Sequence, residues 1–168
     1  MSDRPADVPP GGGTHGGGRP ATQAYAGLGP RFVARLIDGI LVSVSVSIVL
    51  GILPGVSPGG VVGGVVGGLA ALAYFVVMET SRGATVGKML LRLKVADADG
   101  GSAVSTDASF RRNAWMLLGV LSGVPFFGWL AALVSLAAVV VIAVTISGDE
   151  RKQGLHDQVA HTVVLEVR

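Results

Sequence analysis

The chain has 168 residues, 50% of them hydrophobic and 14% charged, and its mean hydropathy is +0.63. A composition this apolar and this poor in charge excludes an ordinary soluble domain. The formal net charge is only +2 and cysteine is absent, so neither a nucleic-acid-binding surface nor a disulfide framework is indicated.

The N-terminal segment, residues 1–29, is rich in glycine and proline and poor in aliphatic side chains. Such a segment buries too little apolar surface to offset the entropy lost on ordering it. We therefore expect a disordered cytoplasmic tail over 1–29 and a membrane domain over 30–168.

Two apolar stretches follow, over about 32–53 and 61–79, with a proline- and glycine-rich loop between them. A helix of about 20 apolar residues is long enough to cross the hydrocarbon core of a bilayer. The second stretch carries two pairs of glycines at a spacing that lets another helix approach its backbone closely. These helix-packing residues are Gly63, Gly64, Gly67 and Gly68. If two copies of the chain pack against each other through these glycines, the protein is a homo-oligomer, which is the assembly we expect.

A polar connector over 80–106 precedes the second apolar half of the chain. Its LLRLKV run alternates like a strand, DADGG is a turn signal, and HTVVL near the C-terminus is a second short alternating run. The two runs predict a small β-hairpin-like element on the cytoplasmic side. The TVGK sequence lacks the first glycine and the final Ser or Thr of a phosphate-binding loop, so no nucleotide cofactor is expected.

Two further spans are predicted over 107–124 and 127–147, with Thr106 as the N-cap of the first and Pro125 between them. The third span is the weakest of the four, because Arg111 and Arg112 must lie at the membrane interface. A helix lying in the interface over 107–124, with one long span instead of two, is the alternative.

The placement of basic residues favours four spans. All thirteen Lys and Arg lie within 4–35, 82–112 and 151–168, whereas the loops 54–60 and 123–128 carry no charge. Four crossings put every basic residue on one side, which the positive-inside rule assigns to the cytoplasm. The sequence thus predicts a multi-pass protein of the plasma membrane with both termini cytoplasmic and with anionic lipid headgroups as partners of its basic face.

Asp38 is the only charged residue between Arg35 and Glu79. A carboxylate inside a span costs about 2.5–3.5 kcal/mol on insertion scales, so such a residue has a partner or a function. Arg31 lies on the same face of the predicted helix, about 10 Å away along its axis, and Arg35 is three residues before Asp38. One interpretation is an ion pair that fixes the cytoplasmic helix end, and the other is a titratable site in an ion or proton path.

The segment RFVARLID, with Arg31 and Asp38, resembles the first-helix signature of the RDD family of integral membrane proteins, which is named for one Arg and two Asp. The connector resembles the family's T-x-G-K and L-x-V-x-D-x-x-G segments, and its matching residues are Thr85, Gly87, Lys88, Leu93, Val95, Asp97 and Gly100. The family's C-terminal segment is matched by His156, Asp157, Ala160, Thr162, Val163 and Val164. His161 departs from the pattern, which often has glycine there.

The resemblance covers about residues 26–165 and implies an all-α polytopic membrane protein in which the Arg and the two Asp matter. Asp157 is then the second aspartate. We expect a polar or ion-binding network at the cytoplasmic face, formed by Arg31, Arg35, Asp38, Lys88 and Asp157. Glu79, at the end of the second span, is predicted to be an interfacial residue outside this network, and a role within the network is the alternative.

The predicted function is that of a small transporter or ion-coupling protein that uses the Asp/Arg network. The alternative is a membrane scaffold or accessory subunit in which the same cluster is structural. An enzyme is not expected, because no nucleophile–base pair or paired carboxylates stand in a convincing context. Metal ligands are not expected either, since His156 and His161 fit a solvated turn and Asp97 and Asp99 fit a turn rather than a calcium loop.

Overall fold

The computed structural model describes residues 24–57, 59–100, 103–124 and 127–167. The predicted tail therefore falls largely outside the described residues. Its last part is ordered, however, because Tyr25 forms a β-bridge with Leu165 and the first helix begins at Leu28. The folded part of the chain thus begins before the boundary predicted at residue 30.

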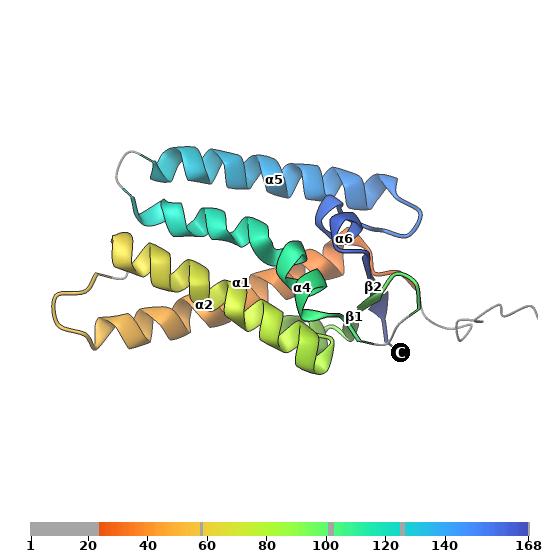
Figure 1. The fold of residues 1–168 in the computed structure, drawn as a ribbon, viewed down its shortest axis with the longest axis horizontal. Helices are drawn as coiled ribbons and strands as arrows, with labels where there is room; N and C mark the ends of the chain where they lie inside the picture. Colours follow the sequence, from red (N-terminus) through yellow and green to blue (C-terminus); the bar gives the residue numbers. More distant parts are fainter. Residues whose placement is uncertain (1–23, 58, 101–102, 125–126, 168) are drawn as a thin grey trace, which may run out of the picture.

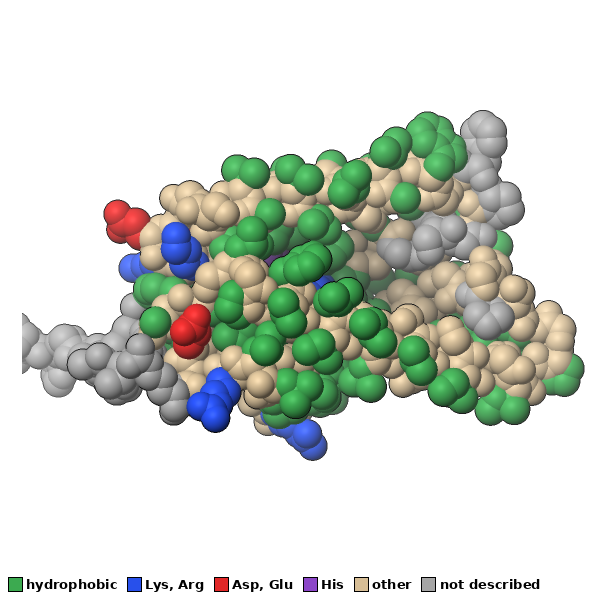
Figure 2. All heavy atoms as spheres, turned by 180° about the vertical axis from the view of Figure 1, so that it is seen from behind, with side chains coloured by type: hydrophobic (Ala, Val, Ile, Leu, Met, Phe, Trp, Pro, Cys, Tyr) green, Lys and Arg blue, Asp and Glu red, His purple; other side chains and the backbone are tan. Residues whose placement is uncertain are grey.

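Among the described residues, three helices are long and apolar enough to cross a membrane: α1 (Leu28–Gly51), α2 (Val61–Arg82) and α5 (Gly128–Gly148). They run lengthwise along the molecule (Figure 1). Their outer faces are apolar, as the exposed series Leu36, Ile40, Val44 and Ile48 on α1 illustrates. Hydrophobic side chains cover much of the surface in Figure 2, whereas charged side chains gather toward one end.

The residues predicted to form a third spanning helix, 107–124, do not make one long α-helix but belong to two shorter elements, α4 (Thr106–Asn113) and the 3₁₀ helix η1 (Ala114–Gly123). The N-cap is Ser105, whose side chain accepts a hydrogen bond from the backbone N–H of Ala108, so the prediction of Thr106 was wrong by one residue. η1 packs against α2 and α5. From α4, which lies at the end of the bundle that carries the sheet, the chain therefore runs back through η1 to the opposite end, where α5 begins (Figure 1).

A two-stranded antiparallel sheet forms at one end of the bundle from β1 (Leu93–Asp97) and β2 (Thr162–Glu166). The predicted pairing of the two alternating runs is confirmed, with Val95 opposite Val164. The strands are far apart in sequence, so the element is not a hairpin. On the other side of β2, the backbone N–H of Ala26 donates to Val164 O at 2.9 Å, which ties the start of the chain to the sheet.

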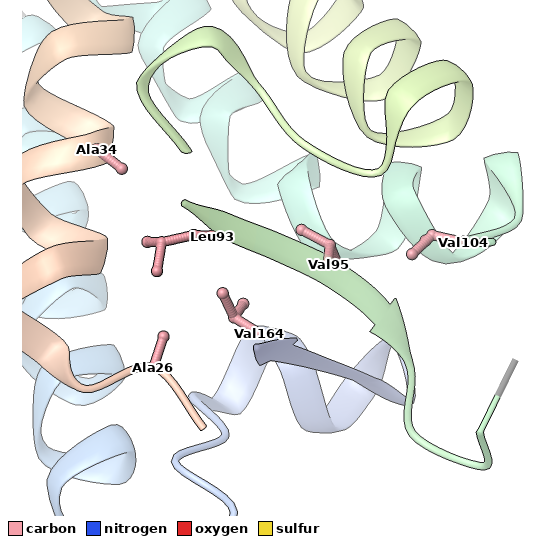
Figure 3. Packing of buried hydrophobic residues seen from close by; sticks show 6 residues of the cluster. All are labelled: Ala26, Ala34, Leu93, Val95, Val104 and Val164. Atoms are coloured by element: carbon pink, nitrogen blue, oxygen red, sulfur yellow. The ribbon is translucent and has the colours of Figure 1, made fainter. Parts of the chain in front are cut away.

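A small apolar core joins the sheet to α1. Ala34 on α1 points toward Leu93 and Val164 on the strands (Figure 3). The complete cluster is Ala26, Ala34, Leu93, Val95, Val104 and Val164. Two one-turn helices, α3 (Val86–Leu90) and α6 (Leu155–Val159), lead into β1 and β2 respectively. The core therefore holds the two strands, into which these short helices lead, against the start of α1.

Candidate functional site

Asp38 is completely buried on α1, and its partners are neutral donors. Its carboxylate accepts hydrogen bonds from Tyr74 Oη at 2.8 Å, Thr85 Oγ1 at 2.5 Å and the Gly87 backbone N–H at 2.7 Å. Within the described residues, no basic side chain lies within ion-pair distance of it. The interpretation of Asp38 as an ion-pair partner of Arg31 or Arg35 was therefore wrong, and the carboxylate instead joins α1 to α2 and to the start of α3.

Gly87 allows α3 to reach this carboxylate. A Cβ atom at this position would lie 2.2 Å from the carbonyl oxygen of Ala34 and 3.1 Å from Cγ of Asp38. Only glycine permits so close an approach of two backbones. The glycine of the T-x-G-K segment is thus explained by helix docking and not by phosphate binding.

Arg31 forms an ion pair with Asp157, the second aspartate, at 2.5 Å between Nη1 and Oδ2. The two side chains are 8% and 0% exposed, so the pair is removed from solvent. Arg31 Nε also donates to Ala26 O at 3.1 Å, and Asp157 Oδ2 accepts from the Gly154 N–H at 3.2 Å. Burial by itself would raise the pKa of Asp157, but the positive charges of Arg112 and Arg31 outweigh it and lower the pKa to about 2.

Glu79 on α2 is the centre of a second group of charges. It is fully buried and forms an ion pair with Lys88 on α3. Its other carboxylate oxygen accepts from Ser109 Oγ and from Asn113 Nδ2, each at 2.9 Å. The prediction that Glu79 is an interfacial residue outside the network was wrong. Burial and the nearby Arg112 lower the pKa of Lys88 to about 8, although Glu79 opposes the shift.

Arg112 connects the two groups, and the sequence reasoning did not assign it to the network. Its Nη2 lies 3.2 Å from Asp157 Oδ1 and its Nε lies 3.9 Å from Glu79 Oε1. A signal was present in the sequence, because Ser109, Arg112 and Asn113 have the i, i+3, i+4 spacing that puts polar side chains on one helix face. Arg111, the neighbouring residue, is exposed and pairs with Asp107 on α4.

Arg35 occupies a different environment from the other basic residues of the cluster. Its guanidinium carbon lies 3.9 Å from the ring centre of Phe75 and 5.1 Å from that of Trp115. Its hydrogen bond to Asn113 is a long one, 3.4 Å from Nη1 to Oδ1. No carboxylate in the described part of the chain lies within ion-pair distance, so aromatic faces and an amide stabilise this cation.

A cavity of about 490 Å³ extends from Arg35 between α1, α2 and η1 toward the opposite end of the bundle. In Figure 2 the surface is hollowed below α5, toward the end of the molecule away from the charged side chains. All four predicted packing glycines line it, namely Gly63, Gly64, Gly67 and Gly68. A Cβ atom at Gly68 would lie 2.7 Å from Val120 Cγ2, so this glycine permits close approach of η1 within the same chain.

The histidines and carboxylates of the described residues do not form a metal-binding group. Within the described residues, no cluster of three or more His, Asp and Glu side chains could hold a metal ion. His156 Nε2 lies 3.2 Å from Asp157 Oδ1. Burial, together with the nearby arginines, lowers the pKa of His156 to about 3, and the Asp157 charge only partly opposes this shift. The imidazole is therefore neutral at pH 7.

Apolar outer faces, helices long enough to span and a buried ionic cluster at one end together define a polytopic membrane protein. The model of the RDD family matches residues 25–161, and the chain therefore belongs to this family. The Arg and the second Asp of its signature form an ion pair, whereas the first Asp holds a neighbouring loop. No curated protein and no solved structure matches the chain.

Proposed function

We propose that this membrane protein is a small transporter, with the buried charge network as the closed cytoplasmic end of its pathway and the cavity as its substrate chamber. The cavity of about 490 Å³ that ends at Arg35 is the observation that carries the proposal. A scaffold needs no cavity of this size among its membrane helices, whereas a carrier needs one. Intramembrane charged residues that face such a space typically mark a substrate or ion path.

The proposed topology has four crossings, with α4 and η1 together forming the third. The ion pair of Arg31 with Asp157 and that of Glu79 with Lys88 put the start of α1 and the ends of α2 and α5 at the same end of the bundle. α4 begins at that end, and α5 begins at the other. An even number of crossings follows if α1 spans, which agrees with both termini in the cytoplasm of a plasma-membrane protein.

The network has a feature suited to opening and closing. Arg112 contacts Asp157 at 3.2 Å and approaches Glu79 only at 3.9 Å, so one cation lies between two carboxylates from different elements. Exchange of Arg112 between these partners would loosen α4 from either α2 or α6 without leaving a carboxylate alone, since Lys88 and Arg31 remain. Asp38 in this mechanism keeps α3 fixed and does not itself carry an ion.

A structural scaffold is the second candidate, and one observation favours it. The charges of the network tie α1, α2, α3, α4 and α6 together, and Asp38 has three hydrogen-bond donors. A cluster this fully connected would also hold a rigid platform for a partner. In that case the cavity would be filled by lipid or by the partner and no solute would cross.

The test is solute-dependent charge or proton movement in proteoliposomes, followed with voltage- and pH-sensitive dyes under gradients of inorganic cations and of organic anions. The variants are Arg35→Gln in the cavity and Arg111→Gln on the exposed face of α4 as the matched control. A transporter predicts flux in the wild type and in Arg111→Gln and loss of flux in folded Arg35→Gln. Absence of flux in folded wild-type protein across all gradients would reject the transporter in favour of the scaffold.

A further inference from the structure

One cation of the buried cluster has no carboxylate within ion-pair distance among the described residues, although Asp38, whose partners are neutral donors, has no cation either. The cluster holds four basic side chains, Arg31, Arg35, Lys88 and Arg112, and three carboxylates, Asp38, Glu79 and Asp157. Arg31, Lys88 and Arg112 each lie within 4.0 Å of a carboxylate oxygen. Arg35 does not, and it is the basic residue that borders the cavity. A cation without a carboxylate within 4.0 Å therefore lies at the cavity end.

The cavity lining is complementary to an anion with an apolar body. Among the described residues, Arg35 is the one charged side chain that lines it, and no carboxylate does so. Hydroxyl groups come from Ser43 and Ser47 on α1 and from Ser135 on α5. Most of the remaining wall consists of glycine, valine, phenylalanine, tryptophan and methionine. The stretch of α1 from Arg35 to Ser47 is about 18 Å long, so a charged group at Arg35 leaves room for an apolar body along the helices.

The geometry of Arg35 leaves donors available. The guanidinium carbon lies over the rings of Phe75 and Trp115, which accept no hydrogen bond from it in the plane of its five N–H donors. One of them makes the long bond to Asn113. The indole N–H of Trp115 is buried and has no acceptor among the described residues. The end of the cavity is therefore rich in donors and poor in acceptors.

We propose that the cavity binds a small organic anion, a carboxylate or phosphate group on an apolar body, with Arg35 as its counter-charge. That this anion is the transported substrate rests on the proposed transporter function. Binding of the anion does not depend on transport and can be measured separately. A soluble organic anion and the headgroup of an anionic lipid offer the same chemistry, so the experiment has one arm for each.

Binding can be followed at Trp115 itself. The chain has two tryptophans, and Trp129 is 60% exposed on α5, so Trp129→Phe leaves Trp115 as the one tryptophan reporter. The purified protein in a neutral detergent is titrated with iodide, an anionic quencher, and in parallel with acrylamide, a neutral one. We expect saturable quenching by iodide and linear quenching by acrylamide. Arg35→Gln should remove the saturable part, at least a tenfold loss of iodide affinity.

Two controls separate binding from folding. Arg111→Gln removes an exposed arginine and should keep the saturable quenching, whereas Arg35→Lys keeps the charge and should bind iodide with reduced affinity. If Arg35→Gln fails to fold, as judged by circular dichroism, Arg35→Lys and competition decide instead. Equal iodide quenching in folded Arg35→Gln and in the parent, or linear quenching in the parent, would overturn the proposal.

Competition identifies the source of the anion. Displacement of iodide by phenyl phosphate or benzoate indicates a soluble organic anion, and displacement only by phosphatidylglycerol in mixed micelles indicates a lipid headgroup. Displacement by neither overturns the proposal. Saturable binding without any flux would reject the transporter function and keep the anion site. Flux without Arg35-dependent binding would reject the anion site and keep the transporter function.

Discussion

Asp38 has three donors that match a carboxylate, from Tyr74, Thr85 and the backbone of Gly87. Asp38→Asn replaces one acceptor oxygen with an NH₂ group that faces a donor. Since hydrogen bonds to charged groups contribute about 1.5–3 kcal/mol each, we expect a loss of stability of at least that order. Thermal unfolding in detergent measures it, with the exposed Asp107→Asn as control. Unchanged stability together with lost flux in Asp38→Asn would instead put Asp38 in the transport path.

Gly87 gives a second prediction at the scale of one residue. The methyl group of Gly87→Ala would overlap the Ala34 carbonyl, because its Cβ would lie 2.2 Å from that oxygen. Overpacking of this kind typically costs about 1–3 kcal/mol, and displacement of α3 would add the loss of bonds to Asp38. Gly39→Ala, where a Cβ meets no atom within 4 Å, is the control on α1. A melting temperature equal for both variants would contradict the docking described here.

The single elements differ in how far the sequence determines them. The three long helices follow from apolar length, and the two strands follow from alternation, because both are local properties of the chain. The partners of the charged residues could not be predicted. Arg31 and Asp157 are 126 positions apart, and their pairing depends on how α6 docks against α1. Sequence spacing along α1 favoured Asp38 as the partner of Arg31, but neutral donors from α2 and α3 occupy that carboxylate.

α4 carries two adjacent arginines in opposite environments, which gives a matched pair of variants. Arg112→Gln removes a buried cation that approaches two carboxylates, and breaking a buried pair costs about 3–5 kcal/mol. Arg111→Gln removes an exposed pair whose contribution is below about 1 kcal/mol. Unfolding in detergent should therefore separate the two variants clearly. A similar small loss for both would show that Arg112 does not connect the two charge groups.

His156 on α6 makes the free energy of unfolding depend on pH. The pKa of His156 falls from 6.5 to about 3 on folding, so the unfolded chain binds more protons between these values. The stabilisation is complete above pH 6.5 and is lost as the pH falls toward 3, at a rate of up to about 1.4 kcal/mol per pH unit. His156→Gln should reduce this slope between pH 6.5 and 4, whereas the exposed His161→Asn should retain it. An unchanged slope in His156→Gln would contradict the burial of the neutral imidazole.

The whole molecule has its charge network and sheet at one end and an uncharged pair of loops at the other. Because the natural chain has no cysteine, single cysteines at Ser57, Asp99 and Glu150 report topology directly with a membrane-impermeant maleimide. Four crossings predict that Ser57→Cys is labelled from outside and that Asp99→Cys and Glu150→Cys are labelled only after permeabilisation. Labelling of Glu150→Cys from outside would show that α4 and η1 lie in the interface, which leaves three crossings.

The central claim is that Arg35 and the cavity beside it make this chain a carrier. The most direct measurement is the transient current that follows a concentration jump of an organic anion, such as benzoate or phenyl phosphate, over proteoliposomes on a solid-supported membrane. We expect a current in the wild type and in Arg111→Gln that disappears in folded Arg35→Gln. The same current in Arg35→Gln, or none in folded wild-type protein, would contradict it.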